Sequence, residues 1–196
     1  MTETPIDVVD ELTADHRAAL ELLDEVIFSS DPQHRRDTVN TAIAEVVRHT
    51  VAEKVYLHPS MQSHLPDGDE AVQHDIAEHA LLEQVMKDLG QVEVRDPEFH
   101  RLVEAMRKAL REHAEHQEHH RFPHLREHVP AEELARLHAQ VTHAKQAAPT
   151  RPHRDAPHAE PLHKTVDPGA GMVDRLRERL TARAHDDIDP EAIDQP

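Results

Sequence analysis

Four histidines recur along the chain at matched intervals, and their side chains could together bind a metal ion. His16 and His49 are 33 residues apart, and His79 and His113 are 34 residues apart. Glu53 follows His49 by four residues, so on an α-helix the imidazole and the carboxylate project from the same face. Imidazole and carboxylate groups are common ligands of transition metals. The spacing therefore predicts a metal site assembled from several helices.

These intervals belong to an internal repeat. Residues 14–18 align with residues 77–81 at an offset of 63. His49 aligns with His113, and Pro59 aligns with Pro123, both at an offset of 64. The chain before residue 147 therefore has the pattern of two related helical hairpins, with one such histidine on each helix.

Histidine is so frequent in this chain that a single position carries little information. There are 20 His among 196 residues, and a lone His on an apolar helix face is more often a hydrogen-bonded core residue than a ligand. Four histidines at matched intervals on apolar faces are much harder to attribute to coincidence. The remaining histidines are expected at the surface or around the ligands, among them His34, His58, His64, His74, His100, His124, His128 and those of the tail.

Long amphipathic helices must position these side chains, because apolar residues recur with the helical period before residue 147. Asp31-Pro32 and Asp96-Pro97 are typical of helix starts, and Gly90 is typical of a helix end. We expect helices over about residues 6–27, 32–61, 69–89 and 96–128, with a shorter one over 131–145. This pattern predicts an all-α fold, an antiparallel up-down four-helix bundle.

The last 50 residues differ in composition from the rest. Residues 147–171 are rich in Pro, His and Ala, which is typical of an extended linker. Apolar residues return at helical spacing between Met172 and Leu180, which predicts a short amphipathic helix. We therefore divide the chain into a helical domain, residues 1–146, and a tail, residues 147–196.

Charge and composition exclude several classes of function. With 22 Lys+Arg against 39 Asp+Glu the net charge is −17, which argues against nucleic-acid and anionic-membrane partners. Without Cys there is no disulfide, thiolate metal site or cysteine nucleophile, and four Gly leave no Gly-rich phosphate loop. No apolar stretch is long enough for a membrane span, and no secretory signal is visible, so we expect a cytoplasmic protein.

Several short motifs together resemble the hemerythrin family, in particular the bacterial HHE cation-binding proteins. The motifs are Asp15-His16, His49-x-x-x-Glu53 with the following Tyr56-Leu57-His58-Pro59, Glu78-His79, and His113 with the following Phe122-Pro123. The resemblance covers about residues 6–125, and residues 168–174 are similar to the tails of some actinobacterial members. It implies a four-helix bundle around a non-haem di-iron centre, with two oxo- or hydroxo-bridged iron ions.

The resemblance also implies a set of ligands, namely His16, His49, Glu53, His79 and His113. The family usually places a further carboxylate four residues after the last histidine, but this position holds Gln117. Glu118 is the substitute that we favour, with Gln117 as the alternative, although Glu118 faces away from His113 on a regular helix. Glu83, four residues after His79, is another possible ligand.

Tyr56 lies seven residues after His49, on the same helix face, and has two interpretations. It could be an ordinary core residue, or a phenol close to the metal that donates a hydrogen bond or a proton to bound peroxide. The resemblance then favours decomposition of hydrogen peroxide or a role in oxidative stress. Alternatives are reversible binding or sensing of oxygen or nitric oxide, and iron storage. The expected partner is a small molecule, and the expected state is a monomer or weak homodimer.

Overall fold

The computed structural model describes residues 6–146, and every regular element within them is a helix. The helices are α1 (Val8–Phe28), α2 (Pro32–Ala52), α3 (His58–His64), α4 (Gly68–Gln91), α5 (Pro97–His116), α6 (Phe122–His128) and α7 (Ala131–Gln146). Two wider π-helical turns, Glu53–Leu57 and Gln117–Arg121, join α2 to α3 and α5 to α6. The predicted linker and the helix between Met172 and Leu180 lie outside the described residues.

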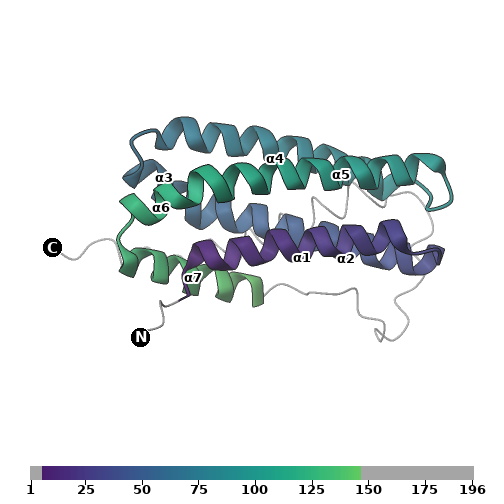
Figure 1. Ribbon diagram of the computed structural model, residues 1–196, viewed down its shortest axis with the longest axis horizontal. Coiled ribbons are helices and arrows are strands. Elements are labelled where there is room, and N and C mark those ends of the chain that lie inside the picture. The colour runs from purple at the N-terminus through teal and green to yellow at the C-terminus, as the bar shows by residue number, and fades with distance from the viewer. Residues whose placement is uncertain (1–5, 147–196) are drawn as a thin grey trace.

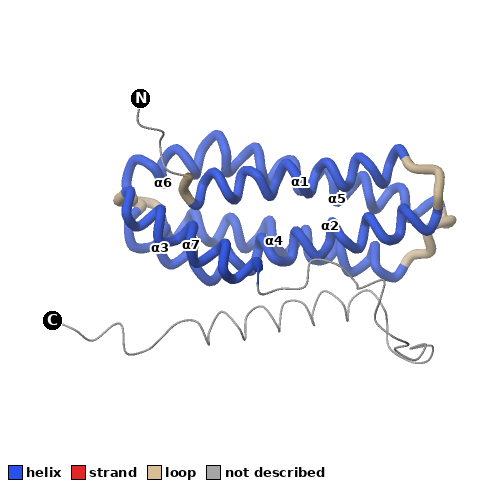
Figure 2. Tube along the Cα trace, turned by 90° about the horizontal axis from the view of Figure 1, so that it is seen from below, coloured by secondary structure: helices blue, strands red, loops and turns tan. Residues whose placement is uncertain are grey.

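Four long helices run side by side along the length of the molecule. Figure 1 shows α4 and α5 next to each other above α1 and α2, and Figure 2 shows the connections gathered at the two ends. The short helices α3 and α6 continue α2 and α5 at one end, where α7 packs against α1 and α2. This arrangement confirms the predicted all-α bundle.

Aspartates start three of the long helices, and two of these starts, at Asp31 and Asp96, are those that the sequence predicts. The Asp31 side chain accepts hydrogen bonds from the backbone N–H groups of Gln33 and His34, and Asp96 accepts one from Glu98. A proline follows each of these two aspartates at the first helical position. Asp7 begins α1 with a reciprocal capping box. These caps set the starts of α1, α2 and α5, which carry three of the four histidines.

The apolar interior is divided into two clusters along the bundle axis. One cluster fills the space between α1, α2, α4 and α5, and includes Leu23, Ile43 and Phe99. The other gathers side chains from α1, α3, α6 and α7, and includes Leu12 and Leu125. On α1, His16 falls between the last member of one cluster and the first of the other. The polar residues thus occupy a layer enclosed by apolar packing.

The helix boundaries differ from the predictions in two respects. Gly90 lies inside α4, which ends one residue later, at Gln91. The expected helices 32–61 and 96–128 are each interrupted by a π-helical turn, at Glu53 and at Gln117. These two residues are 64 positions apart, so the interruption follows the internal repeat. A π turn accommodates one extra residue and often marks a functional site.

We expect Gly68→Ala to lower the melting temperature, because a Cβ atom at this position would clash with the carbonyl oxygen of Met61. That contact is with backbone, so relief requires a shift of the α3–α4 turn, at a cost of about 1–3 kcal/mol. The matched control is Gly90→Ala in the last turn of α4, which should be neutral or stabilise by up to about 1 kcal/mol. Thermal unfolding followed by circular dichroism checks both. Equal melting temperatures for the two variants would contradict the expected clash.

Candidate metal centre

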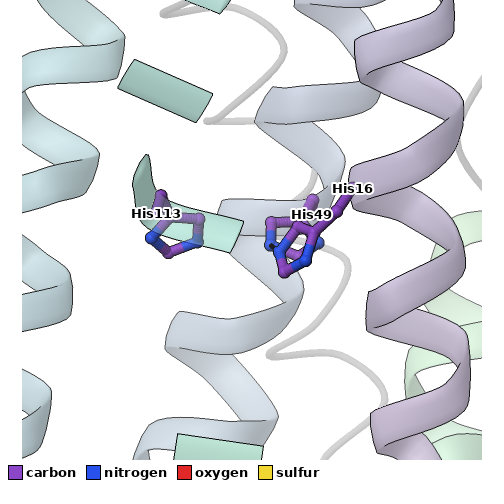
Figure 3. A group of neighbouring side chains, drawn as sticks. All are labelled: His16, His49 and His113. Atoms are coloured by element: carbon purple, nitrogen blue, oxygen red, sulfur yellow. Dashed lines mark hydrogen bonds between the residues drawn. The ribbon is translucent and has the colours of Figure 1, made fainter. Parts of the chain in front are cut away.

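Each of the four long helices contributes one histidine to the interior of the bundle. His16 comes from α1, His49 from α2, His79 from α4 and His113 from α5. His16, His49 and His113 are almost completely buried, and His79 is largely buried. Figure 3 shows His16 and His49 close together, with His113 approaching them from another helix. The four positions that the repeat singles out therefore do converge.

Glu53 lies at the centre of this group. Its Oε2 atom is 2.9 Å from His79 Nε2, 3.3 Å from His49 Nε2 and 3.7 Å from His113 Nε2. His16 reaches the same region through His49, since the two Nε2 atoms are 3.1 Å apart. Glu53 itself is completely buried. A carboxylate oxygen surrounded by imidazole nitrogens in this way is the geometry of a group of metal ligands.

The side-chain atoms that point into this group are arranged to bind a cation and not to form hydrogen bonds with one another. Four of them are buried without a hydrogen-bond partner among the described residues: Glu53 Oε2, His79 Nε2, His113 Nε2 and Gln117 Oε1. They are close, but their geometry is not that of hydrogen bonds. Unpaired buried polar atoms are costly, and a bound cation would satisfy them together. Two triads have ligand atoms within 4.8 Å of one another, His16 with His49 and His113, and Glu53 with His79 and His113.

The charges in the buried group are strongly coupled. Burial lowers the pKa of His49, but the carboxylates of Glu53 and Asp15 more than offset this and raise it to about 10. Burial alone would raise the pKa of Glu53, but His49 and His79 hold it well below its usual range. Burial and the nearby His49 lower the pKa of His16. The metal-free centre therefore contains an ion pair, and the His49 proton must leave when the ring binds a metal.

Carboxylates on the outside of the group orient three of the rings. Glu118 Oε1 is 2.9 Å from His16 Nδ1, and Glu78 Oε2 is 2.8 Å from His113 Nδ1. Asp15 Oδ2 is 3.5 Å from His49 Nδ1. A carboxylate on the far nitrogen fixes the orientation of a ligand imidazole and increases its basicity.

Two of these carboxylates follow the internal repeat. Asp15 and Glu78 each stand directly before a predicted histidine ligand, yet each faces the histidine of the next helix in its hairpin. Asp15-His49 in the first hairpin therefore corresponds to Glu78-His113 in the second. The repeat contains this supporting pair as well as the ligands, although the spacing of the histidines alone did not reveal it.

Gln117, and not Glu118, faces the centre. Gln117 is completely buried, and its side-chain amide donates to Glu53 Oε1 at 2.7 Å and to Asp75 Oδ2 at 3.4 Å. The π-helical turn begins at Gln117, so the local widening does not bring Glu118 inward. Glu118 instead lies beside His16, on the side away from His49. A direct contact between Glu118 and a metal remains a prediction.

Asp75 and His58 join the centre and were not among the predicted ligands. Asp75 is completely buried, and its Oδ2 atom is 3.7 Å from His58 Nε2. The His58 ring stacks on that of His79 with centroids 5.8 Å apart, so His58 is not a surface residue. Burial and the charge of Glu53 raise the pKa of Asp75 to about 7, whereas burial lowers that of His58 to about 4. The available sequence signal was the i, i+4 spacing of Asp75 and His79.

Glu83 and Tyr56 have surroundings that differ from those of the four histidines. Glu83 forms an ion pair with Lys87 at 2.8 Å and lines a cavity between α2 and α4. Tyr56 is buried among the apolar side chains of the cluster around Leu12. A catalytic role for Tyr56 and a ligand role for Glu83 both stay predictions.

The cavity leads to the histidine on α4. Its volume is about 230 Å³, and its walls include Val47, Val51 and Met86 as well as His58 and His79. The lining is half apolar and half polar, and Thr50, Lys54 and Glu83 are polar lining residues besides the two imidazoles. A space of this size admits molecules of a few heavy atoms. The structure thus combines a group of buried donor atoms with a route from the surface.

Comparison with known proteins agrees with this geometry. The hemerythrin HHE cation binding domain matches residues 7–125, which contain all the convergent histidines. An uncharacterized hemerythrin-like protein of Schizosaccharomyces pombe is 23% identical over 174 residues, covering 88% of this chain and 86% of that protein. No solved structure gives a significant match. No helix within residues 6–146 has both the length and the apolar character needed to cross a membrane. The chain therefore belongs to the hemerythrin family, and its HHE cation-binding domain spans residues 7–125.

Proposed function

We propose that this chain binds two non-haem iron ions and decomposes hydrogen peroxide. The observation that carries the proposal is the set of unpaired imidazole nitrogens around the buried Glu53 carboxylate. The proposed ligands are the four convergent histidines and Glu53, which would bridge the two ions. An N- and O-donor set of this kind on bundle helices is suited to iron.

Asp75 is the second carboxylate that we assign to this centre. A neutral amide offers a weaker oxygen ligand than a carboxylate, so Gln117 cannot replace a bridging glutamate. Asp75 is buried next to the Gln117 amide and one helical turn before His79, where it can supply the missing negative charge. Glu118 then supports the His16 ring, as its 2.9 Å contact with Nδ1 indicates.

In the proposed reaction one peroxide loses two electrons and two protons to become dioxygen, and a second gains them to become two waters. The two irons would hold the electrons between these half-reactions. Asp75 can hold a proton in this reaction, and its Oδ2 atom lies 3.7 Å from Nε2 of His58, whose ring stacks on that of His79. With a pKa of about 7 Asp75 can take up and release a proton near neutral pH, whereas His58, with a pKa of about 4, stays neutral there and can exchange hydrogen bonds. The cavity that reaches His58 supplies a path for peroxide.

Oxygen production by the iron-loaded protein tests this proposal. The chain is loaded anaerobically with ferrous iron, freed of excess metal, and mixed with hydrogen peroxide in an oxygen-electrode cell. We expect two irons per chain and one dioxygen for every two peroxides consumed. A stable coloured oxygen adduct without turnover would instead support reversible binding of oxygen. Retention of less than about one iron per chain would contradict both.

Tyr56→Phe tests the proposed phenol donor. If the hydroxyl assists peroxide chemistry, removal should lower the turnover number by about tenfold or more while leaving the iron content unchanged. The aromatic ring keeps its place in the buried cluster, so the fold should be preserved. Steady-state oxygen evolution with parallel iron analysis gives the answer. Unchanged turnover would assign Tyr56 to packing alone.

A further inference from the structure

A second group of metal-ligand side chains lies between α4 and α5, next to the proposed iron centre, with which it shares Asp75. His74 and Glu78 are one turn apart on α4, and His116 is on the neighbouring helix α5. Together with Asp75, their ligand atoms all lie within 4.8 Å of one another. His74 is exposed, whereas Glu78 and His116 are partly buried. We propose that His74, Glu78 and His116 bind one divalent first-row transition-metal ion at the surface of the protein.

The positions of the rings support a shared ion. The centroids of His74 and His116 are 4.3 Å apart, although the residues are on different helices. His116 Nδ1 is buried and has no hydrogen-bond partner among the described residues. His74 Nδ1 is 3.7 Å from Glu78 Oε1, which is longer than a hydrogen bond. A cation between these atoms would satisfy each of them.

The donor set indicates which ions would bind. Two imidazoles and one carboxylate are typical ligands of zinc and of ferrous iron, and they leave one position open for water. Donor atoms on one tetrahedral ion lie about 3.3 Å apart when each is about 2 Å from the metal. The present spacing therefore requires the side chains to close slightly, and the exposed His74 has the freedom to do so.

Glu78 gives this surface site a connection to the interior. Its Oε2 atom accepts a hydrogen bond from His113 Nδ1 at 2.8 Å, while its Oε1 atom faces His74. His113 is one of the proposed iron ligands, so a single carboxylate contacts both groups. An ion at the surface site would lie one side chain away from the buried centre.

Zinc titration of the full chain tests the surface site. Metal is first removed with a chelator, and Zn²⁺ binding is then measured by isothermal titration calorimetry. We expect the double variant His74→Ala/His116→Ala to bind one Zn²⁺ fewer per chain than the unmodified protein at micromolar zinc. The variant Glu53→Gln, which alters the buried centre, should retain this ion. Equal stoichiometry and affinity before and after the double substitution would overturn the proposal.

A second histidine pair provides the matched control. His124 and His128 are exposed on α6 with ring centroids 6.0 Å apart, but within residues 6–146 they belong to no group of three potential ligands. We expect His124→Ala/His128→Ala to bind as many Zn²⁺ ions as the unmodified chain. If both double variants lose zinc equally, binding reflects the general abundance of histidine and the surface site is refuted. Iron content of the buried centre, measured separately, distinguishes this failure from failure of the proposed function.

Discussion

Glu53→Gln is expected to empty the buried metal centre. The substitution keeps the size of the side chain but removes the negative charge that faces three imidazoles, those of His49, His79 and His113. A glutamine amide has one neutral oxygen and cannot bridge two cations as a carboxylate does. We expect iron affinity to fall by more than about 100-fold, since even supporting residues around metal ligands change affinity about 10- to 100-fold. Iron content after dialysis, with a competing chelator to obtain affinities, measures this loss.

The metal-free variant should remain folded, which separates loss of a ligand from loss of structure. Without the Glu53 carboxylate, the buried His49 loses most of the interaction that raises its pKa, and it can become neutral. Circular dichroism and thermal unfolding of the metal-free protein check that the helices persist. A Glu53→Gln protein that is folded and retains two irons would refute a centre built around Glu53.

Glu118→Gln is the matched control, because it makes the same chemical change on the other side of His16. In the structure Glu118 contacts His16 Nδ1 and does not face Glu53. We expect its loss to weaken iron binding by no more than about 100-fold, as for a residue that supports a ligand. If Glu118→Gln empties the centre as completely as Glu53→Gln, then Glu118 is itself a ligand, as the sequence suggested.

The sequence was sufficient to predict the bundle and the convergence of the histidines. Helix starts at Asp31 and Asp96 depend on local backbone hydrogen bonds, which the residues themselves specify. The convergence of His16, His49 and His113 follows because matched positions on neighbouring helices of a hairpin lie at the same level of the bundle. Both features depend on periodicity, and periodicity is visible in a single sequence.

Periodicity could not predict which of Gln117 and Glu118 faces the metal centre. This orientation depends on where the helix widens, and a π-helical turn that starts at Gln117 instead of one residue earlier changes which side chain faces inward. Packing against the other helices determines that position. Asp75 was missed for a related reason, since its role depends on contact with Gln117 from the π-helical turn after α5 and with His58 from α3. Contacts between segments that are distant in the chain leave no periodic pattern in the sequence, so the sequence alone does not predict them.

Asp75→Asn is expected to stabilise the metal-free protein and to weaken iron binding. The pKa of Asp75 is about 7 in the folded chain, because of burial and the charge of Glu53, against 3.8 for an unperturbed aspartate. Between these pH values the folded state binds more protons than the unfolded state, so this group lowers stability as the pH rises from about 4 to 7. Above pH 7 the Asp75 carboxylate is ionised in the folded protein, and its burial lowers the free energy of unfolding by the full amount. The neutral side chain of asparagine avoids this loss of stability.

The size of the gain should therefore depend on pH. At pH 8 we expect the metal-free Asp75→Asn protein to be more stable by up to a few kcal/mol, which corresponds to a melting temperature higher by up to roughly 10 °C. The gain should decline towards zero near pH 4, where aspartate is neutral in both states. Asp88→Asn on the same helix is the control, because Asp88 is only partly buried and should show little change at either pH.

Iron binding should change in the opposite direction, and this difference in sign is the decisive result. If Asp75 provides the charge that Gln117 lacks, iron affinity should fall by about tenfold or more in the variant that is more stable without metal. A residue needed only for packing would lose stability and iron together. A variant that gains stability and keeps its full iron affinity would show that Asp75 is a buried carboxylate without a role at the metal. If Asp75 is buried because it binds the metal, its replacement should increase the stability of the metal-free protein and decrease the affinity for iron. No other role of Asp75 predicts both changes together.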